Sequence, residues 1–545
     1  MPSTPTTKSQ VQAYRFVLRR MQSALVRKDA VMLHDPMRTH SRATIVGVCL
    51  AALGLLGFLI WGILSPKPTV PSKDGIVIGK PSGQVYVLLT KPTKRLIPVF
   101  NLASARLLLY AQTLDDDDSG KQTAAAPNGA APSVVGPTVV DDNELRDQIP
   151  RDRKVGIPDG PDLLPSSDQR IDSRWTVCDQ YLPKEGNTEA AAGDEVQTSV
   201  IAGVKDLGPE LKTNQSLLVE SENKDVYLVY RKPETANEPI ASTLRAKVDM
   251  SQPNIVAALQ LETAEPRTIS TGLLNAIPEK AELKPPNIEG FGDDPKPKVA
   301  PPDLKVGSVF SVRPTGKAPV FYVVLRDGIQ QIKRSTGDLI RYRKEVTEGI
   351  EELPADVIQG SNVLKGRIDD STFPAEQTEV LQRSSFPVAC LGWEVTGSGK
   401  NGEERTSVHV GNAVPGIPVN EAGDPKWVDI STPGSSNLRI DHFYMPPGRG
   451  AVVRQATSKE DFNSGPIVLV SDRGVKYGVP DPNTAAVLGL SNQVPAPLSI
   501  LDLLPNGASL DPKDVEQSYD TVPIEPGEYP TKSQDPNGGG QAGGN

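Results

Sequence analysis

The sequence predicts a single N-terminal transmembrane helix followed by an α+β extracytoplasmic region, in which four small αβ repeat domains surround a β-rich central domain. Three observations support this fold class. Residues 43–64 form one long uncharged apolar run, four short β-like runs recur along the rest of the chain, and a stretch rich in β-branched residues lies between the third and fourth of these runs. The 545 residues are sufficient for several domains.

The apolar run ATIVGVCLAALGLLGFLIWGIL, residues 43–64, is the predicted transmembrane helix. A helix of this length spans about 33 Å, against a hydrocarbon core of about 30 Å. Trp61 stands near its end, where indole rings favour the membrane interface, and Pro66 and Pro68 follow it. A signal peptide is disfavoured because it would start nearer the N-terminus and end at a small-residue cleavage site, and a buried core helix is rarely so free of polar residues.

Charge predicts the orientation of this helix. Residues 1–42 carry eight basic and two acidic side chains, a net charge of +6, and since the whole chain carries −9, residues 43–545 carry −15. The positive-inside rule therefore places the N-terminus in the cytoplasm and the bulk of the chain outside. The difference in charge between the two flanks of the helix is weakened by three lysines on the outer flank, Lys67, Lys73 and Lys80.

Residues 1–42 are predicted to form a basic cytoplasmic arm that contains an amphipathic helix over residues 8–33. Apolar side chains recur there at spacings of three and four residues, and arginines and Lys28 occupy much of the remaining surface. Such a helix would lie on anionic lipid, dock onto a partner's cytosolic face, or simply be a solvated flank that fixes the topology. The clearest apolar stripe consists of Tyr14, Val17, Leu18, Met21 and Leu25.

Internal repetition follows the apolar run. The four β-like runs lie at residues 85–89, 226–230, 321–325 and 467–470, and at least two of them are followed by a turn and a further apolar run, as in a hairpin. At a fixed offset of 229 residues, PNIVAALQL from Pro253 matches PNTAAVLGL from Pro482, and identities continue to Leu274 and Leu503. This match predicts a helix entered at Pro-Asn and then a second short helix, in units that act first as scaffolds.

Composition and these repeats set the expected domain boundaries. The first repeat is expected at 70–115 and 139–180, interrupted by a low-complexity insertion at 115–138 that begins with four aspartates. These aspartates lack the spacing of a calcium loop, so a solvated charge run explains them better. The remaining segments are the second repeat at 215–290, the third at 305–385, the central domain at 386–460, the fourth repeat at 461–522 and a flexible tail at 523–545.

Three cysteines are present. Cys49 lies inside the apolar run, so Cys178 and Cys390 are the only two cysteines in the outer portion. An even count in an oxidising compartment favours a disulfide between them, and the alternative is two unpaired buried thiols. The chain-entropy model gives such a bond, which would close a loop of more than 200 residues, about 5 kcal/mol of stabilisation.

No motif points to catalysis or to a bound cofactor. The string closest to a phosphate-binding loop, GWEVTGSGKN from Gly392, has Lys400 two places late and Asn401 where Ser or Thr belongs, so a hairpin turn explains it better. The four histidines form no HExxH motif, and no CxxC or GxSxG occurs. We therefore predict no catalytic, cofactor-binding or metal-ligating residue, and the net charge of −15 argues against nucleic-acid binding.

Several short sequence motifs match those of a known family. They are TTKSQVQAYRFVLRRMQSALVRKD, DPMRTHSRA, IPVFNLASARLLL, VGIPDGP, WTVCD, ISTGLLNAIPE, RGVKYGV and APLSILDLLPNGASL, in this order between about residues 6 and 525. On these strings the chain resembles the EccB family, the membrane components of actinobacterial type VII (ESX) secretion systems. It departs from the family at VGIPDGP, where relatives often read GIPGAP, and in the insertion and the Gly-rich tail.

The resemblance implies a single-pass protein of the bacterial inner (plasma) membrane with four periplasmic repeat domains around a central domain. It also implies a disulfide, which maps onto Cys178 and Cys390. Relatives assemble with the motor ATPase EccC, the pore component EccD and EccE, so a homodimer or higher oligomer within that complex is expected. The predicted function is a structural core subunit that scaffolds the export of WXG-type proteins.

Two alternatives remain from the resemblance. Some relatives are labelled ATPases, which would imply ATP as a ligand. However, no motif in this sequence identifies a residue that would bind or hydrolyse ATP. Only the basic arm would face cytosolic nucleotide. The repeat fold has also been likened to a peptidoglycan-binding phage protein, which implies a cell-wall anchor. The anchor reading is compatible with the structural role.

Overall fold

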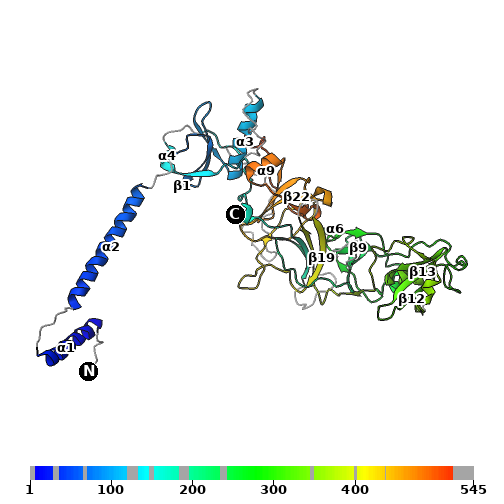
Figure 1. Cartoon of the computed structure of the whole chain (residues 1–545). Coiled ribbons are helices and arrows are strands. Elements are labelled where there is room, and N and C mark those ends of the chain that lie inside the picture. Colours follow the sequence, from blue (N-terminus) through cyan, green and yellow to red (C-terminus); the bar gives the residue numbers. More distant parts are fainter. Residues whose placement is uncertain are drawn as a thin grey trace, which may run out of the picture. The chain divides into compact units, whose positions relative to one another are not determined.

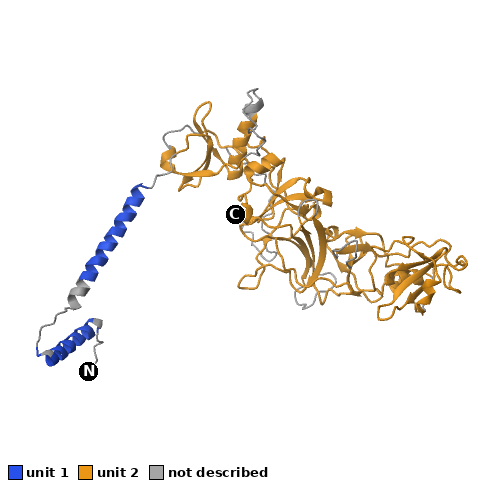
Figure 2. Cartoon of the chain, viewed as in Figure 1, with its two compact units in different colours: residues 1–69 blue, residues 70–545 orange. Residues whose placement is uncertain are grey.

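The computed structural model describes residues 7–28, 36–64, 70–118, 133–146, 152–182, 195–232, 242–343, 349–397, 402–435 and 437–518. The chain divides into two compact units, residues 1–69 and residues 70–545 (Figure 2). The expected insertion at 115–138 and the tail at 523–545 fall largely or wholly outside the described residues.

The first unit contains two helices, α1 (Lys8–Arg27) and α2 (Pro36–Leu64). α1 begins after Thr7, whose backbone N–H donates to the side-chain oxygen of Gln10 at 2.9 Å, and ends at Lys28 in the left-handed conformation. It is shorter than the expected helix over 8–33, and residues 29–35 lie outside the described part of the chain. Within α2, Arg42–Leu64 is long and apolar enough to cross a membrane, with a mean hydropathy of 2.5, and it is not buried by the rest of the chain.

In the described residues of the second unit there are five β-sheets, four of which share one order of elements. Three strands form an antiparallel meander, a helix follows, and a fourth strand then lies parallel to the first strand of the meander. The first of these sheets contains β1 (Gly75–Lys80), β2 (Val85–Leu89), β3 (Arg95–Val99), α3 (Leu102–Asp118), β4 (Pro137–Asp141) and α4 (Asp142–Arg146).

The second and third sheets add a fifth short strand parallel to the last strand of the meander. The second sheet contains β7 (Gln215–Glu220), β8 (Val226–Lys232), β9 (Ser242–Lys247), α5 (Pro253–Ala258), β10 (Arg267–Thr268), α6 (Thr271–Ala276) and β11 (Glu279–Lys280). The third contains β12 (Val309–Val312), β13 (Val320–Leu325), β14 (Gly328–Ile332), α7 (Arg334–Tyr342), β15 (Glu351–Leu353), α8 (Asp356–Gln359) and β16 (Val363–Leu364).

The fourth sheet lies at the C-terminal end of the described chain. It contains β22 (Gly450–Ala456), β23 (Ile467–Ser471), β24 (Lys476–Val479), α9 (Pro482–Leu488), β25 (Val494–Pro497) and α10 (Leu498–Leu501). The four β-like runs of the sequence are the middle strands β2, β8, β13 and β23 of the four meanders. Alternate side chains of each middle strand pack into different apolar cores, so both faces of the strand are buried, which explains its nearly continuous apolar character.

The central sheet combines two distant parts of the chain in the strand order β19-β18-β5-β6-β21-β20. β5 and β6 precede the second sheet in sequence, whereas the other four strands follow the third. The strands are β5 (Trp175–Leu182), β6 (Glu195–Ala202), β18 (Val388–Thr396), β19 (Glu403–Gly411), β20 (Val428–Asp429) and β21 (His442–Tyr444). One further strand, β17 (Glu379–Val380), pairs with β7 of the second sheet.

These pairings differ from three expected boundaries. The first repeat was expected to extend to residue 180, but β5 hydrogen-bonds to β18 and β6 and so belongs to the central sheet. The central domain was expected at 386–460, but it also includes β6 and loses β22, which pairs with β23 of the fourth sheet. The fourth sheet therefore starts at Gly450 rather than at residue 461. The physical reason is that these strands pair with segments far away in the sequence, and such pairing does not change the local amino-acid composition from which the boundaries were predicted.

Equivalent helices of different sheets pack against one another. The first helices pair as α3 with α9 and as α5 with α7, and the second helices α6 and α10 form a third pair. Arg106 of α3 donates from Nη1 to the carbonyl of Leu488 in α9 at 2.6 Å, and Figure 1 shows these two helices side by side. Gly272 of α6 lies against Leu503, just after α10.

These contacts merge the sheets into shared cores. One large apolar core joins the central sheet to the second and fourth sheets, through residues such as Leu391, Leu217 and Leu501. A second core joins the first and fourth sheets, and a third joins the second sheet to α7 of the third. The sheets of the second unit are therefore not independent along the chain, because its three largest apolar cores combine residues of more than one sheet.

Candidate functional site: the disulfide and the Asp179 cluster

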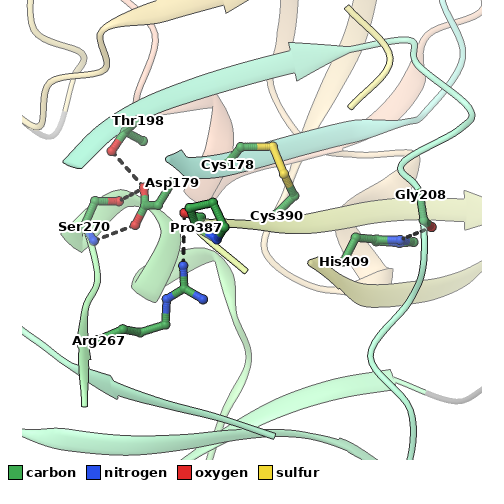
Figure 3. The surroundings of a disulfide bond; sticks show 9 residues. All are labelled: Cys178, Asp179, Thr198, Gly208, Arg267, Ser270, Pro387, Cys390 and His409. Carbon is green, nitrogen blue, oxygen red and sulfur yellow. Dashed lines mark hydrogen bonds between the residues drawn. A yellow bond between two sulfur atoms is a disulfide. The ribbon is translucent and has the colours of Figure 1, made fainter. Parts of the chain in front are cut away.

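The site predicted from the sequence is the pair Cys178 and Cys390, and the structure joins them across neighbouring strands (Figure 3). β5 and β18 are antiparallel, and their register places Cys390 directly opposite Cys178. The Cα atoms are 4.0 Å apart and the sulfur atoms 2.07 Å apart, and both side chains are buried. The bond links two positions that lie 212 residues apart in sequence.

Side chains alternate between the two faces of these strands, so the disulfide occupies one face of the central sheet. On that face the cysteines pack with Ile201 and Tyr444 in a small apolar cluster. On the other face, Val177 and Ala389 belong to the large core shared with the second and fourth sheets. Both faces are therefore covered at the disulfide, which leaves it shielded from solvent.

Asp179, the next residue on β5, is a buried carboxylate with three hydrogen-bond donors (Figure 3). It accepts from the backbone N–H and the hydroxyl of Ser270, each at 2.7 Å, and from the hydroxyl of Thr198 at 2.9 Å. Ser270 is also the N-cap of α6 and accepts from the N–H of Leu273 at 3.1 Å. Burial raises the pKa of Asp179, and the hydrogen bonds from Ser270 oppose that rise.

Arg267, the first residue of β10, extends this group of side chains. Its guanidinium donates to the carbonyls of Phe386 and Pro387, at 3.1 and 3.3 Å, and lies 5.2 Å from the ring centre of Tyr181. The hydroxyl of Tyr181 donates to the carbonyl of Thr268. We refer to Asp179, Tyr181, Thr198, Arg267 and Ser270 as the Asp179 cluster.

The Asp179 cluster connects the central sheet to the second sheet. Two of its residues lie on β5 and one on β6, whereas Arg267 and Ser270 flank the junction of β10 and α6. The adjoining cavity has a volume of only about 10 Å³, and a single water needs about that much room. The polar groups of the cluster are therefore hydrogen-bonded to one another or to nearby backbone, and this geometry supports a structural junction rather than a substrate-binding site.

Sequence reasoning did not single out this cluster, because its members come from three separate segments. One local signal was present: Asp179 is a charged residue within the otherwise mostly apolar strand WTVCDQYL. A carboxylate on a buried strand requires donors from elsewhere in the fold, since an unpaired buried charge is strongly destabilising.

A serine–histidine pair on β19 was also not foreseen. Ser407 Oγ lies 3.0 Å from Nε2 of His409, and Nδ1 of His409 lies 2.9 Å from the carbonyl oxygen of Gly208. A carbonyl can only accept, so Nδ1 carries the proton and Ser407 donates to Nε2. Burial lowers the pKa of His409, which keeps the ring neutral.

This pair has the hydrogen-bond order of a nucleophile and its base, but its surroundings do not favour reaction. Ser407 is buried in the middle of a paired strand, and the cavity beside it has a volume of about 80 Å³. Two of the cations that line this cavity are paired with carboxylates: Arg405 contacts Glu210 at 2.6 Å, and Arg174 contacts Glu394 at 3.6 Å. A nucleophile needs donors aimed at the developing oxyanion, and these guanidinium groups are engaged by carboxylates instead.

The first half of the string resembling a phosphate-binding loop is a β-strand. Residues from Gly392 to Thr396 belong to β18 and pair with β19 as far as Glu403. An extended, paired backbone cannot wrap a phosphate with consecutive N–H groups as a P-loop does. Lys400 and Asn401 lie outside the described residues.

His442 belongs to another closed polar arrangement. Its Nδ1 lies 2.9 Å from an oxygen of Asp429, its Nε2 lies 3.1 Å from the side-chain oxygen of Gln197, and its ring stacks on Trp427 at 3.9 Å. Within the described ranges, no group of three or more His, Cys, Asp or Glu residues is placed to hold a metal ion.

A chain with one candidate membrane helix and a second unit whose sheets are joined through shared cores and buried polar contacts belongs to the class of membrane-anchored scaffolds. Residues 3–524 match the family model described as "Type VII secretion system ESX-1, transport TM domain B". The chain therefore belongs to the EccB family of type VII secretion systems.

Individual relatives agree with this assignment. The protein named "ESX-1 secretion system ATPase EccB1" of Mycobacterium tuberculosis is 28% identical over 531 residues, which cover 96% of both chains. The protein named "ESX-3 secretion system ATPase EccB3" of Mycolicibacterium smegmatis is 28% identical over 534 residues, covering 95% of this chain and 92% of the relative.

Solved structures share the fold. A chain in the structure of an intact ESX-5 inner membrane complex superposes with a TM-score of 0.63 at 23% identity, covering 96% of this chain and 98% of that one. A chain in the structure of an EccB3 dimer from the ESX-3 core complex gives a TM-score of 0.62 at 25% identity, covering 82% of this chain and all of that one.

Proposed function

We propose that this chain is a structural core subunit of a type VII secretion complex in the bacterial inner membrane and scaffolds the export of WXG-type proteins. The observation that carries the proposal is the family match over residues 3–524. The second unit, residues 70–545, supports it, because its buried polar groups join sheets together and the guanidinium group of Arg405, beside Ser407 and His409, is engaged by Glu210.

The architecture within this proposal is a cytoplasmic arm, one membrane helix, and four αβ repeats around a central β-rich domain. The shared order of elements in the four outer sheets supports four copies of one unit. The net charge of +6 before the apolar run and −15 from its start onward supports a cytoplasmic N-terminus.

The proposed partners are the motor ATPase EccC, the pore component EccD, EccE and a second copy of this chain. The solved relatives support this set, since their structures are described as an ESX-5 inner membrane complex and as an EccB3 dimer from the ESX-3 core complex. A subunit with one membrane helix and a large unit of sheets that share apolar cores suits the positioning of other subunits around an exit path.

Affinity purification from gently solubilised membranes tests the proposal. The full chain carrying a C-terminal tag should recover the motor and pore subunits, identified by mass spectrometry. A matched chain that lacks residues 1–28 but keeps α2 shows whether the arm contributes to recovery. Isolation of the full chain as a lone monomer under conditions that preserve a known secretion complex would contradict the proposed role.

A second candidate, ATP binding or hydrolysis, is favoured only by the printed names of the relatives, which include the word ATPase. It predicts ATP turnover by the purified full chain in the presence of Mg²⁺, with loss of turnover in Lys400→Ala and retention in Lys317→Ala. Background turnover in all three preparations would exclude this candidate.

A further inference from the structure

One edge of the second sheet is unpaired and borders a cavity. β17 runs parallel to β7 and pairs with no other strand of the described chain. The backbone N–H groups of Glu379 and Leu381 donate to the carbonyls of Asn214 and Ser216, each at 2.9 Å. Because these N–H groups point towards β7, the backbone groups of the residues that alternate with them point to the opposite edge.

That outer edge offers backbone groups without a partner. Within the described residues, no hydrogen bond involves the N–H or the carbonyl of Thr378 or Val380, or the N–H of Gln382. These three residues alternate along the strand, so their unpaired groups recur at about 6.6 Å. Unpaired N–H and C=O groups in a row are a template for another extended chain.

A cavity of about 450 Å³ lies against this edge. Both Glu379 and Val380 line it, although consecutive side chains of a strand lie on opposite faces of the sheet, so the cavity borders the edge of β17 rather than one face. Its volume is within the range of about 300 to 1,000 Å³ that is typical of ligand sites. The rest of the lining comes from the chain after α5 and from the start of α7, through Gln260, Thr263, Ala264 and Arg334. We refer to this cavity as the β17 groove.

The lining of the β17 groove carries more negative than positive charge. Glu376 and Glu379 are exposed and line the groove, and neither forms an ion pair with another described residue. Arg334 is the cationic residue of the lining, and its Nε already lies 3.8 Å from the buried carboxylate of Asp338. Charge complementarity therefore favours a ligand with a basic side chain.

These observations favour an extended peptide of another protein over other occupants. A peptide backbone matches polar groups that recur at every second residue, whereas a sugar or a small metabolite does not. A second copy paired through the same edge would place Glu376 and Glu379 of the two copies beside each other, and like charges in such pairs are destabilising. The C-terminal residues 519–545 carry four acidic side chains and one basic side chain, so they do not complement the groove.

We propose that the β17 groove binds an extended, basic peptide segment of a partner protein by β-augmentation. The segment adds a strand to the second sheet by bonding to the backbone of Thr378, Val380 and Gln382. A lysine or arginine of the segment lies beside Glu376 and Glu379. This inference does not depend on which membrane complex the chain joins.

Selection from a phage-displayed library of random heptapeptides on the full chain in detergent micelles tests the inference. Enriched peptides should carry a lysine or arginine, and their synthetic fluorescent forms should bind the full chain in fluorescence anisotropy. N-methylation of alternate amides should distinguish the two edges of the peptide. Methylation of one set should weaken binding about tenfold or more, because it removes the hydrogen bonds to β17, and methylation of the other set should have little effect.

Charge reversal in the groove provides a second measurement. The Glu376→Lys, Glu379→Lys chain should bind the basic peptide about tenfold more weakly than the wild-type chain does. It should prefer the same peptide with glutamate in place of the basic residue. Glu222→Lys, Glu421→Lys is the matched control and should retain wild-type binding, because both residues are exposed and neither lines the groove.

Three results would overturn the inference. The first is a selection that enriches no peptide above the level obtained with the charge-reversed chain. The second is binding that tolerates N-methylation of both sets of amides, or that weakens equally in the charge-reversed and control chains. The third is a dimer of the full chain that dissociates on charge reversal, since that result would assign the edge of β17 to a second copy.

Discussion

The residues that characterise this protein hold distant segments together instead of reacting with a ligand. Cys178 and Cys390 bond β5 to β18 on one face of the central sheet, and Asp179 ties β5 to the N-terminus of α6 on the other. Because consecutive residues of one strand make the two contacts, β5 is fixed from both sides. The energetic importance of each contact can be measured separately.

Removing the disulfide should lower the free energy of unfolding of the outer unit, residues 70–545, by about 3 to 5 kcal/mol, because the bond closes a loop of 212 residues. The double change Cys178→Ala and Cys390→Ala makes the comparison in urea denaturation. In the full chain it should also abolish the faster migration of the unreduced protein on denaturing gels. Cys49→Ala is the matched control and should leave migration unchanged, and unreduced and reduced wild-type protein that migrate identically would contradict the prediction.

Asp179 should make stability depend on pH with a defined sign. Burial raises the pKa of its carboxyl in the folded state, so the folded chain binds more protons than the unfolded chain above the ordinary pKa of about 4. The free energy of unfolding should therefore fall as pH rises from about 4 towards the raised pKa. Asp179→Asn should remove this contribution and give a flatter profile in urea denaturation at a series of pH values. The exposed Glu222→Gln should retain the wild-type slope, and parallel profiles for wild type and Asp179→Asn would rule the assignment out.

At the scale of elements, the helices act as connectors between sheets. α3 packs on α9, α5 on α7 and α6 on α10, so that equivalent helices of different sheets meet each other. Next to α10, Leu503 leaves little room for a side chain at position 272 of α6. A Cβ atom there would lie 3.1 and 3.2 Å from the two methyl carbons of Leu503.

Gly272→Val should destabilise the outer unit by about 2 kcal/mol, because a branched side chain must displace Leu503 within a well-packed core. Thermal or urea unfolding measures the loss. Gly478→Val is the matched control, since nothing lies within 4 Å of a Cβ atom at that position. Equal effects of the two substitutions would show that the α6–α10 contact is not tightly packed.

Elements with a local signature could be predicted from the sequence, and those formed by distant pairing could not. The runs that became β2, β8, β13 and β23 are apolar because each strand is bonded on both edges and buried. Helix α5 and its equivalent α9 could be located because their segments carry the same residues at one fixed offset along the chain, and the same holds for α6 and its equivalent α10. Membership of β5 and β6 in the central sheet could not be predicted, since their partner β18 lies about 200 residues further along and the strands themselves resemble any buried strand.

The candidate functional site, likewise, could be predicted from the sequence only in part. Cys178 and Cys390 could be paired because no other cysteine lies outside the apolar run. Asp179, Thr198 and Ser270 are ordinary polar residues in sequence, and only the fold brings their oxygen and nitrogen atoms together. The Ser407–His409 hydrogen bond likewise depends on the alternation of side chains along β19 and on a carbonyl from a separate loop.

At the scale of the whole outer unit, the beginning and the end of the described chain share one core. Ile76, Val87 and Ile97 of the first sheet pack with Leu510 and Val515. Backbone bridges continue the contact, from Val99 through Val155 to Ser518. The first sheet is thus completed by residues that lie more than 400 positions later.

Ending the chain after Leu504 should loosen the first sheet. The truncation removes two fully buried side chains, Leu510 and Val515, which together stabilise the fold by about 4 kcal/mol. Hydrogen exchange followed by mass spectrometry should show faster exchange in β1, β2 and β3, and little change in the third sheet. A chain ending at Ser518 is the control, and unchanged exchange in the first sheet of the shorter chain would contradict the shared core.

The shared core has a consequence for how the subunit is made. During synthesis the first sheet emerges long before the residues that complete it, and the strand carrying Cys178 waits 212 residues for Cys390. This unit therefore reaches its final form only after nearly the whole chain has been synthesised. A prematurely terminated product keeps the apolar surface of the first sheet uncovered, which proteases can recognise before the protein enters an assembly.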